Sequence, residues 1–253
     1  MTPKVALVTG AAKRVGRTIA LALAEDGFDV AVHYATSRAD AEEVAERIRA
    51  VGRRVALVEA DLAEAGAPAR IVEETAAALG PPLVLVNNAS RFERDDVNTM
   101  TVEQWDAHLN VNLRAPVFLA QAFARLKPQG VEGNIVNIID QRVLKLNPLF
   151  FSYTISKAAL FTATRTLAQA LAPRAIRVNA IGPGPTLPSK RMTEEDFVRQ
   201  CSLTLLGCGT SPEEIADAVR YILRAHALTG QMIVLDGGQH LLWQTPDITE
   251  VPE

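Results

Sequence analysis

Short apolar runs alternate with amphipathic segments along nearly the whole chain. Seven runs have the length and composition of buried strands, at residues 4–9, 29–34, 54–59, 83–87, 134–139, 177–181 and 232–235. Helical periodicity marks intervening segments at residues 17–26, 64–79, 102–126, 156–171 and 212–224. This alternation predicts an α/β fold, a Rossmann-like doubly wound parallel sheet of about seven strands with helices on both faces.

The length of 253 residues and the hydrophobic content of 48% suit one large α/β domain. We see no internal repeat and no linker, so a single domain is expected over residues 1–253. Residues 184–210 resemble a substrate-loop insertion, since residues 184–199 are rich in Pro, Thr and Glu. Such loops often close over a site as lids.

Charge and cysteine content narrow the function classes. The net charge of −3 gives no reason to expect a nucleic-acid partner. No apolar run reaches the roughly 20 residues of a membrane span, so no membrane partner is expected. Cys201 and Cys208 have no histidines at metal-ligand spacing, so no metal is expected. Reduced thiols, and an N-terminus that enters a strand at once, indicate a cytoplasmic protein.

The first strand is followed by a glycine-bearing turn and a helix. Gly10 permits a tight turn, and Gly16 lets the helix pack closely against the strand. Arg14 and Val15 lie between these glycines. Amides at the start of the helix would then face an anion. This strand–turn–helix context predicts a site for the phosphates of a dinucleotide.

The end of the second strand favours NADP over NAD. An NAD site usually places an acidic residue there to hold the ribose 2′-hydroxyl. Here the strand ends at Tyr34, and the next carboxylate along the chain is Asp40. Arg14 and Arg38 could instead surround a 2′-phosphate. Further donors are available from His33, Thr36 and Ser37. The alternative for Arg38 is that it opens the next helix as a solvated charge.

Tyr153 and Lys157 are four residues apart, which places them on one face of a helix. An adjacent ammonium favours the phenolate and would lower the pKa of Tyr153, as suits a general acid or base. The alternative is an ordinary exposed Tyr/Lys pair. The dinucleotide turn at the start of the chain favours the catalytic interpretation.

These motifs together resemble the short-chain dehydrogenase/reductase family across residues 4–242. In chain order they are Thr9-Gly10-x-x-x-Arg14-x-Gly16, Asp61, Asn87-Asn88-Ala89, Asn112, Tyr153-x-x-x-Lys157 and Pro183-Gly184. The resemblance implies a single Rossmann-like domain that transfers hydride to or from a nicotinamide. It also implies a homo-oligomer, a homotetramer with two-fold axes.

The resemblance assigns roles residue by residue. Tyr153 would be the proton donor, Lys157 would hold the nicotinamide ribose, and Asn112 would help carry a proton-relay water. The expected cofactor-binding residues are Gly10, Arg14, Val15, Gly16, His33, Tyr34, Ser37, Asp61, Leu62, Asn88, Ala89, Ser90, Lys157, Pro183, Gly184 and Thr186. Without the resemblance, Asn87 and Asn88 would be interpreted as turn residues.

Two positions depart from most of the family. Arg14 stands where a third glycine or an alanine is usual, and Asp140 stands where a serine usually holds a substrate carbonyl. A carboxylate cannot donate a hydrogen bond to a carbonyl unless it is protonated. An ordinary ketone reductase is therefore less expected.

Both departures occur in pteridine reductases and the related dihydromonapterin reductases, which the chain also resembles at its cofactor turn and at Phe92. That subgroup places a pterin between the nicotinamide and an aromatic ring. The expected substrate-binding residues are Arg14, Ser90, Phe92, Asp140 and Tyr153. Desolvation would favour a protonated Asp140 that acts as an acid with Tyr153. The alternatives are a core or lid aromatic for Phe92 and a turn cap for Asp140.

The sequence thus predicts an NADPH-dependent reductase of a C=N bond in a dihydropterin, with dihydrofolate as a second substrate if the 184–199 segment leaves the site open. One alternative is a reductase of ketones, imines or quinones on the same fold. Another is a non-catalytic NADPH-binding sensor, which is disfavoured because Tyr153, Lys157 and Asn112 are all present.

Overall fold

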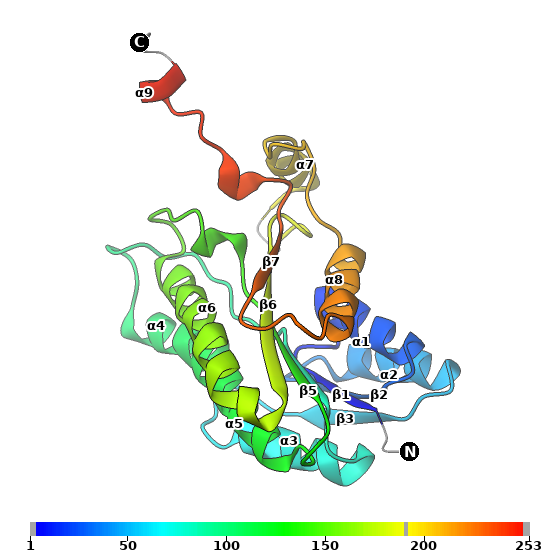
Figure 1. Ribbon diagram of the computed structural model, residues 1–253. Coiled ribbons are helices and arrows are strands. Elements are labelled where there is room, and N and C mark those ends of the chain that lie inside the picture. The colour runs from blue at the N-terminus through cyan, green and yellow to red at the C-terminus, as the bar shows by residue number, and fades with distance from the viewer. Residues whose placement is uncertain (1–3, 190–191, 250–253) are drawn as a thin grey trace.

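The computed structural model describes residues 4–189 and 192–249, and its centre is one parallel sheet (Figure 1). Seven strands lie in the order β3-β2-β1-β4-β5-β6-β7. Their bounds are β1 Val5–Val8, β2 Asp29–Tyr34, β3 Val55–Glu59, β4 Val84–Asn87, β5 Gly133–Ile138, β6 Ile176–Pro183 and β7 Met232–Leu235. The predicted doubly wound, single-domain fold is confirmed.

Helices cover both faces of the sheet (Figure 1). The α-helices are α1 Arg14–Glu25, α2 Arg38–Ala50, α3 Ala67–Leu79, α4 Val102–Leu109, α5 Ala115–Leu126, α6 Phe151–Leu171, α7 Glu194–Ser202, α8 Pro212–Arg224 and α9 Pro246–Thr249. Short helices of other types are η1 Asn110–Arg114, η2 Gln141–Val143, η3 Ala172–Arg174 and η4 Gln239–Leu241. Because strand side chains alternate between faces, β1 contributes to two separate cores. Ala6 and Val8 pack with α1, α2 and α8, whereas Val5 and Leu7 pack with α3, α5 and α6.

The strand order reverses beside β1, and this reversal locates the site. From β1 the chain runs outward through β2 to β3, and it returns to the other side of β1 with β4. Loops that leave β1 and β4 therefore diverge, and a crevice opens at the carboxyl ends of these strands. The glycine-bearing turn follows β1, and Asn88 follows β4, so both lie at this crevice.

Several helix boundaries differ from those predicted. Helix α6 begins at Phe151 rather than at residue 156, so Tyr153 and Lys157 both lie within it. Helix α1 begins at Arg14 inside the glycine turn, and α3 begins at Ala67 rather than at residue 64. The segment at 102–126 is interrupted by the π-helical turn η1.

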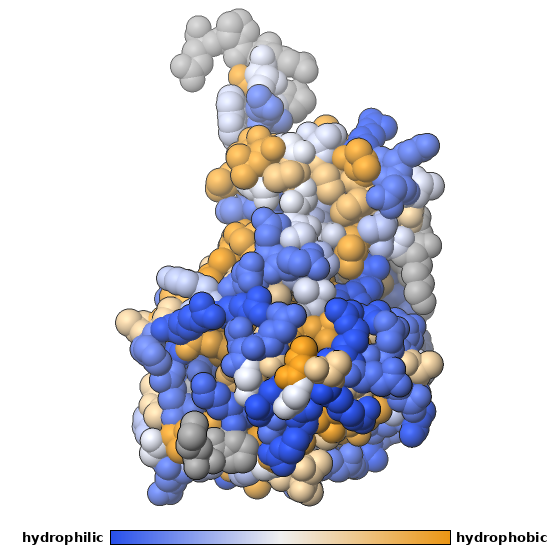
Figure 2. Space-filling view, turned by 90° about the vertical axis from the view of Figure 1, so that its right-hand side faces the viewer, coloured by the Kyte–Doolittle hydropathy of each residue, from blue (hydrophilic) through white to orange (hydrophobic). Residues whose placement is uncertain are grey.

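The expected insertion at 184–210 contains the helix α7, which local periodicity did not indicate. Lys190 and Arg191 of this segment lie outside the described residues. Figure 2 shows polar residues over much of the face that carries α1, α2 and α8, and hydrophobic side chains higher up, towards α7. In α7 and in the segment between α7 and α8, the exposed large hydrophobic residues are Val198, Leu203, Leu205 and Leu206. Among the described residues, no helix is long and apolar enough to cross a membrane.

Candidate active site

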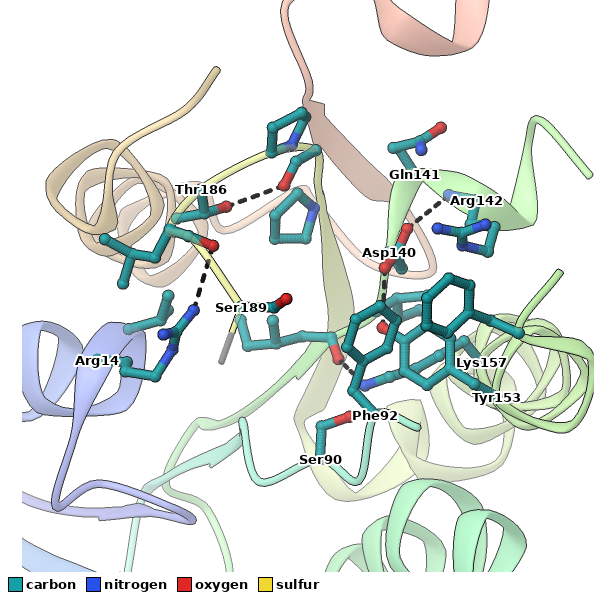
Figure 3. Close-up of a pocket in the computed structure, with 18 of the residues that line it drawn as sticks. Arg14, Ser90, Phe92, Asp140, Gln141, Arg142, Tyr153, Lys157, Thr186 and Ser189 are labelled. Atoms are coloured by element: carbon teal, nitrogen blue, oxygen red, sulfur yellow. Dashed lines mark hydrogen bonds between the residues drawn. The ribbon is translucent and has the colours of Figure 1, made fainter. Parts of the chain in front are cut away.

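A cleft of about 380 Å³ lies at the carboxyl ends of the central strands (Figure 3). It gathers predicted residues from five separate parts of the chain. Those that line it are Arg14, Val15, Asn88, Ser90, Phe92, Asp140, Tyr153, Lys157, Pro183, Gly184 and Thr186. Within 4–189 and 192–249, no group of three or more His, Cys, Asp or Glu side chains is placed to hold a metal ion. The cleft is thus the candidate active site.

Tyr153 and Asp140 meet at the back of this cleft. The Tyr153 hydroxyl donates a hydrogen bond of 2.8 Å to Oδ2 of Asp140 (Figure 3). The other oxygen, Oδ1, accepts from the backbone amide of Arg142 at 2.8 Å. Asp140 therefore caps η2, as the alternative interpretation expected, and also contacts the candidate acid. The carboxylate accepts both bonds and presents no donor of its own.

The surroundings of Tyr153 correct the prediction about its acidity. Burial raises the pKa of Tyr153 well above its ordinary value, and the charge and hydrogen bond of Asp140 raise it further. Lys157 lies 5.8 Å from the Tyr153 ring centroid, and its Nζ donates to the Ile138 carbonyl at 2.8 Å. The pKa of Lys157 is lowered to about 8 by burial, against the opposing effect of Asp140. Tyr153 is thus kept protonated, and the expected lowering of its pKa by Lys157 is wrong for this structure.

Asn112 anchors the loop that follows β4. Its side chain is fully buried, with Oδ1 accepting from the Ser90 hydroxyl at 3.2 Å and from the Arg91 amide at 2.8 Å. Its Nδ2 donates to the Arg91 carbonyl at 2.9 Å and to the Ser156 hydroxyl at 3.0 Å. All four bonding positions of the carboxamide are used. A relay water near Asn112 stays a prediction, and it would need another group of this segment to bind it.

An aromatic wall borders the cleft beside Tyr153. The Phe92 ring is parallel to that of Phe150, with centroids 4.5 Å apart and an interplanar angle of 3°. It also meets the Tyr153 ring edge-on at 4.7 Å. Phe92 is 42% exposed, so it is not a core aromatic. Sequence reasoning missed Phe150 and also Arg142, whose guanidinium lies 5.0 Å from the Phe150 centroid.

The glycine turn has the geometry that a dinucleotide requires. Gly10 has a φ of +62°, which favours glycine, and a Cβ on Gly16 would lie 2.3 Å from the Gly10 carbonyl oxygen. Asn88 holds the turn by donating to the carbonyls of Thr9 and Gly10 at 2.8 and 3.1 Å. Helix α1 begins with no side-chain cap and no acidic residue in its first turn. Its first amides are therefore available to an anion, and the turn fits the phosphates of a dinucleotide.

His33 supports this turn from below rather than pointing at a phosphate. Its Nδ1 accepts from the Gly10 amide, and its Nε2 is 3.1 Å from the Ala60 carbonyl, which assigns the ring proton to Nε2. The imidazole is 2% exposed, and burial lowers its pKa to about 4. The ring is neutral with both nitrogens occupied, so the expected donation from His33 to a 2′-phosphate is wrong. Tyr34 is also buried, and its hydroxyl donates to Glu59 at 2.9 Å.

Basic side chains still surround the expected 2′-phosphate position. Arg38 is exposed at the start of α2, as the alternative interpretation expected, and its Nε donates to Glu42 at 3.0 Å. Lys13, which sequence reasoning missed, lies 2.9 Å from Asp40. Ser37 makes no capping bond with its side chain. Exposed ion pairs contribute little to stability, so both cations can turn towards a bound phosphate.

Arg14 joins the glycine turn to the loop after β6. Its backbone has a φ of +54°, a left-handed conformation that favours glycine. Its guanidinium donates to the Pro188 carbonyl at 3.0 Å and to the Leu187 carbonyl at 3.3 Å, and Figure 3 shows the second of these bonds. Thr186 in this loop donates to the Gly184 carbonyl at 3.0 Å. Arg14 therefore fixes the loop across the mouth of the cleft.

The remaining predicted cofactor residues lie outside the cleft lining. Asp61 is exposed and accepts from the Ala63 amide at 2.8 Å, while Leu62 is buried. The Ala89 amide donates to the Thr9 hydroxyl at 3.1 Å. Their roles at the cofactor stay predictions. Gln141, which sequence reasoning missed, lines the cleft, and its buried Oε1 has no hydrogen-bond partner among the described residues.

Fold and cleft define a Rossmann-like oxidoreductase, and comparison with known proteins gives the family. Residues 10–240 match the family model described as enoyl-(acyl carrier protein) reductase. The 3-oxoacyl-[acyl-carrier-protein] reductase of Synechocystis sp. is 33% identical, over 94% of this chain and 97% of its own length. The chain belongs to this family, the short-chain dehydrogenase/reductases, as its motifs predicted.

Solved structures narrow the similarity further. The crystal structure of FolM alternative dihydrofolate reductase 1 from Brucella suis in complex with NADP is 50% identical, with a TM-score of 0.94. The match covers 98% of this chain and 100% of that one. A short-chain dehydrogenase from Burkholderia cenocepacia J2315 in complex with NADP is 34% identical, with a TM-score of 0.87 over 93% of this chain and 97% of its own. Both complexes contain NADP, the cofactor that the end of the second strand predicted.

Proposed function

We propose that this protein reduces a C=N bond in the ring of a dihydropterin and uses NADPH as the hydride donor, with dihydrofolate as a second substrate. The observation that carries this proposal is the hydrogen bond from Tyr153 to Asp140, because it pairs the candidate acid with a carboxylate where most of the family has a serine. Reduction of C=N requires a hydride at carbon and a proton at nitrogen. The similarity to the FolM alternative dihydrofolate reductase 1 supports the same substrate class.

The proton comes from the pair at the back of the cleft. Bound NADPH supplies the hydride. Tyr153 keeps its proton at neutral pH because its pKa is raised, and with substrate bound its hydroxyl would turn from Asp140 and give that proton to a ring nitrogen. Asp140 holds that hydroxyl beside the cleft and would relay a proton from solvent back to the Tyr153 oxygen. Buried Lys157, bonded to the Ile138 carbonyl, supports the wall against which the nicotinamide ribose would lie.

The aromatic wall supplies a surface for a flat ring. Phe92 is exposed to the cleft and stands edge-on to Tyr153. A heteroaromatic ring stacked on Phe92 would gain dispersion and quadrupole interactions worth about 0.5–1.5 kcal/mol beyond its buried area. Ser90 and Arg14 border the same space and offer polar contacts to the edge of the ring.

Ketone reduction is the second candidate, since relatives named 3-oxoacyl-[acyl-carrier-protein] reductase match most of the chain. Against it, Asp140 accepts both of its hydrogen bonds and offers no donor to a carbonyl. An imine or quinone substrate belongs to this second candidate. A non-catalytic sensor is disfavoured, because Tyr153 and Lys157 both line the cleft. We further propose a homotetramer located in the cytoplasm, with neither nucleic acid nor membrane as a partner.

The test is NADPH oxidation by the purified protein with dihydrobiopterin, dihydrofolate and a panel of ketones that includes a 3-oxoacyl thioester. The proposal expects turnover of dihydrobiopterin and little or none with the ketones. Ketone turnover without pterin turnover would transfer the assignment to the second candidate. Cofactor binding without any turnover would favour the sensor.

A further inference from the structure

Helix α6, which carries Tyr153, begins without a capping side chain of its own. Its N-cap residue Phe150 has a left-handed backbone with a φ of 57° and makes no side-chain bond to the helix. Asp95, which precedes α6 by more than fifty residues, caps the helix instead. Its carbonyl accepts from the amides of Phe150 and Phe151 at 2.8 and 3.4 Å, and its carboxylate accepts from the amide of Ser152 at 3.2 and 3.3 Å. A carboxylate in this place also interacts favourably with the helix dipole.

Asp95 belongs to a buried chain of hydrogen bonds that runs in one direction. The Ser152 hydroxyl donates to Asp95, and it lies 2.7 Å from Nδ1 of His108. At the other side of the ring, Nε2 accepts from the Glu93 amide at 3.2 Å, so the ring proton must be on Nδ1. The order is therefore His108 to Ser152 to Asp95. All three side chains are at most 3% exposed, and burial lowers the pKa of His108, which favours the neutral ring.

This chain of bonds connects the two segments whose side chains form the aromatic wall of the cleft. Phe92 directly precedes Glu93, whose amide is held by His108 on α4. Phe150 and Tyr153 lie at the start of α6, where Asp95 caps the helix. The segment between β4 and α4 contains no helix or strand of its own, so these buried bonds, with those of Asn112, fix its path.

We propose that Asp95, Ser152 and His108 form a positioning unit that sets Phe92 against Phe150 and Tyr153 and so fixes the aromatic wall on which a flat ring would lie. None of the three lines the cleft. They act through Phe92 and Tyr153, so they are positioning residues. The inference rests on the proposed function only in the choice of a pterin as substrate.

Asp95→Asn tests the unit because it keeps the size of the side chain and reverses the direction of the hydrogen bond between residue 95 and the Ser152 hydroxyl. The amide donates where the carboxylate accepted, so the Ser152 hydroxyl would turn towards His108. The ring proton would then move to Nε2 and oppose the Glu93 amide, which is also a donor. We expect kcat/KM for dihydrobiopterin to fall about tenfold, mainly through KM, with the NADPH dissociation constant changed by less than about twofold.

Hydrogen exchange supplies a readout that is independent of activity. In Asp95→Asn, amides of residues 92–97 and 150–156 should exchange about tenfold faster, while those of 160–170 keep their protection. Ser152→Ala leaves the backbone amides of the cap in place and removes the hydroxyl that links Asp95 to His108, so exchange should rise at 92–97 but not at 150–156. The matched control is Asp106→Asn, which removes an exposed carboxylate from α4 and should change neither segment.

The outcomes separate the positioning role from a purely structural one. If Asp95→Asn lowers the melting temperature but keeps kcat/KM and exchange at wild-type values well below that temperature, the proposal is overturned. If Asp95→Asn does not fold, Ser152→Ala decides: faster exchange at 92–97 supports the unit, and unchanged exchange overturns it. If the wild-type protein reduces no pterin, the proposed function fails. The exchange data alone then test whether Asp95, Ser152 and His108 position the two segments.

Discussion

The hydroxyl of Tyr153 donates to the carboxylate of Asp140 at 2.8 Å, and this bond determines the chemistry of both residues. Burial and this anionic partner together raise the pKa of Tyr153, which therefore keeps its proton at neutral pH. The same bond occupies Oδ2 of Asp140 and holds its carboxylate at the lining of the cleft. A group that holds a proton beside a flat aromatic wall suits the reduction of a ring C=N bond better than the binding of a ketone.

Tyr153→Phe should reduce turnover by about 100-fold or more, because the general acid is lost. NADPH affinity should stay close to the wild-type value, since Lys157 keeps its bond to the Ile138 carbonyl. Steady-state rates and a fluorescence titration of NADPH measure the two quantities. Near-wild-type turnover in this variant would exclude Tyr153 as the acid.

Arg38→Gln should weaken the preference for NADPH over NADH by about tenfold, the effect of one charge-assisted hydrogen bond to the 2′-phosphate. The wild-type protein should prefer NADPH by roughly 100-fold, with Lys13 and Ser37 as the other expected contacts. Arg47→Gln, at the far end of α2, is a matched control for charge. Equal effects of both variants would show that Arg38 acts only through net charge.

The lowered pKa of buried His33 predicts that the folded protein loses stability in acid. Burial holds its pKa near 4 in the folded protein, against an ordinary value of 6.5. The unfolded chain therefore binds the proton first, so the stabilisation is complete above about pH 6.5 and is lost as the pH falls towards 4. At about 1.4 kcal/mol per pKa unit, the loss amounts to roughly 3 kcal/mol.

Urea unfolding of the wild-type protein and of His33→Gln, at a series of pH values, isolates this effect. The difference in unfolding free energy between the two proteins should narrow as the pH falls through this range. Parallel curves would mean that His33 does not titrate on unfolding. Carboxylates that titrate in both proteins cancel in the difference.

The sequence predicted the sheet and most of the cleft because both follow from local patterns. Apolar runs mark buried strands, and residues at the carboxyl ends of parallel strands converge at one edge of the sheet. The role of His33 could not be predicted in this way. Whether a side chain at a strand end faces the phosphate or the turn depends on its packing against the next strand, here at Ala60.

The acidity of Tyr153 and the cap of α6 were missed for a related reason. Burial and the negative charge of Asp140 raise the pKa of Tyr153 in spite of the adjacent Lys157, and both effects arise only in the folded chain. Asp95 and His108 lie 57 and 44 residues from Ser152, and no short motif indicates that these three meet. The left-handed backbone of Arg14 likewise could not be predicted, because it arises only when the turn forms.

A homotetramer is expected in solution, and the apolar surface of α5 offers one place for a contact between copies. Phe118 on this helix is 47% exposed and Leu126 is 37% exposed. Burying an exposed apolar patch against an identical one is the usual basis of a two-fold interface. Light scattering at micromolar concentration should give four subunits, and Phe118→Glu should shift the mass to smaller species. A wild-type monomer would contradict this expectation.

The most direct test of the central claim is the activity of Asp140→Ser towards two substrates in one preparation. Serine is far too weak an acid to replace the carboxyl group in a proton-transferring pair, so reduction of dihydrobiopterin should be lost. The same change restores the hydroxyl with which most of the family holds a carbonyl, so ketone reduction should stay level or rise. NADPH oxidation with each substrate controls for misfolding. If dihydrobiopterin reduction survives at the wild-type rate, Asp140 is only a turn cap, and the assignment to pterins loses its chemical basis.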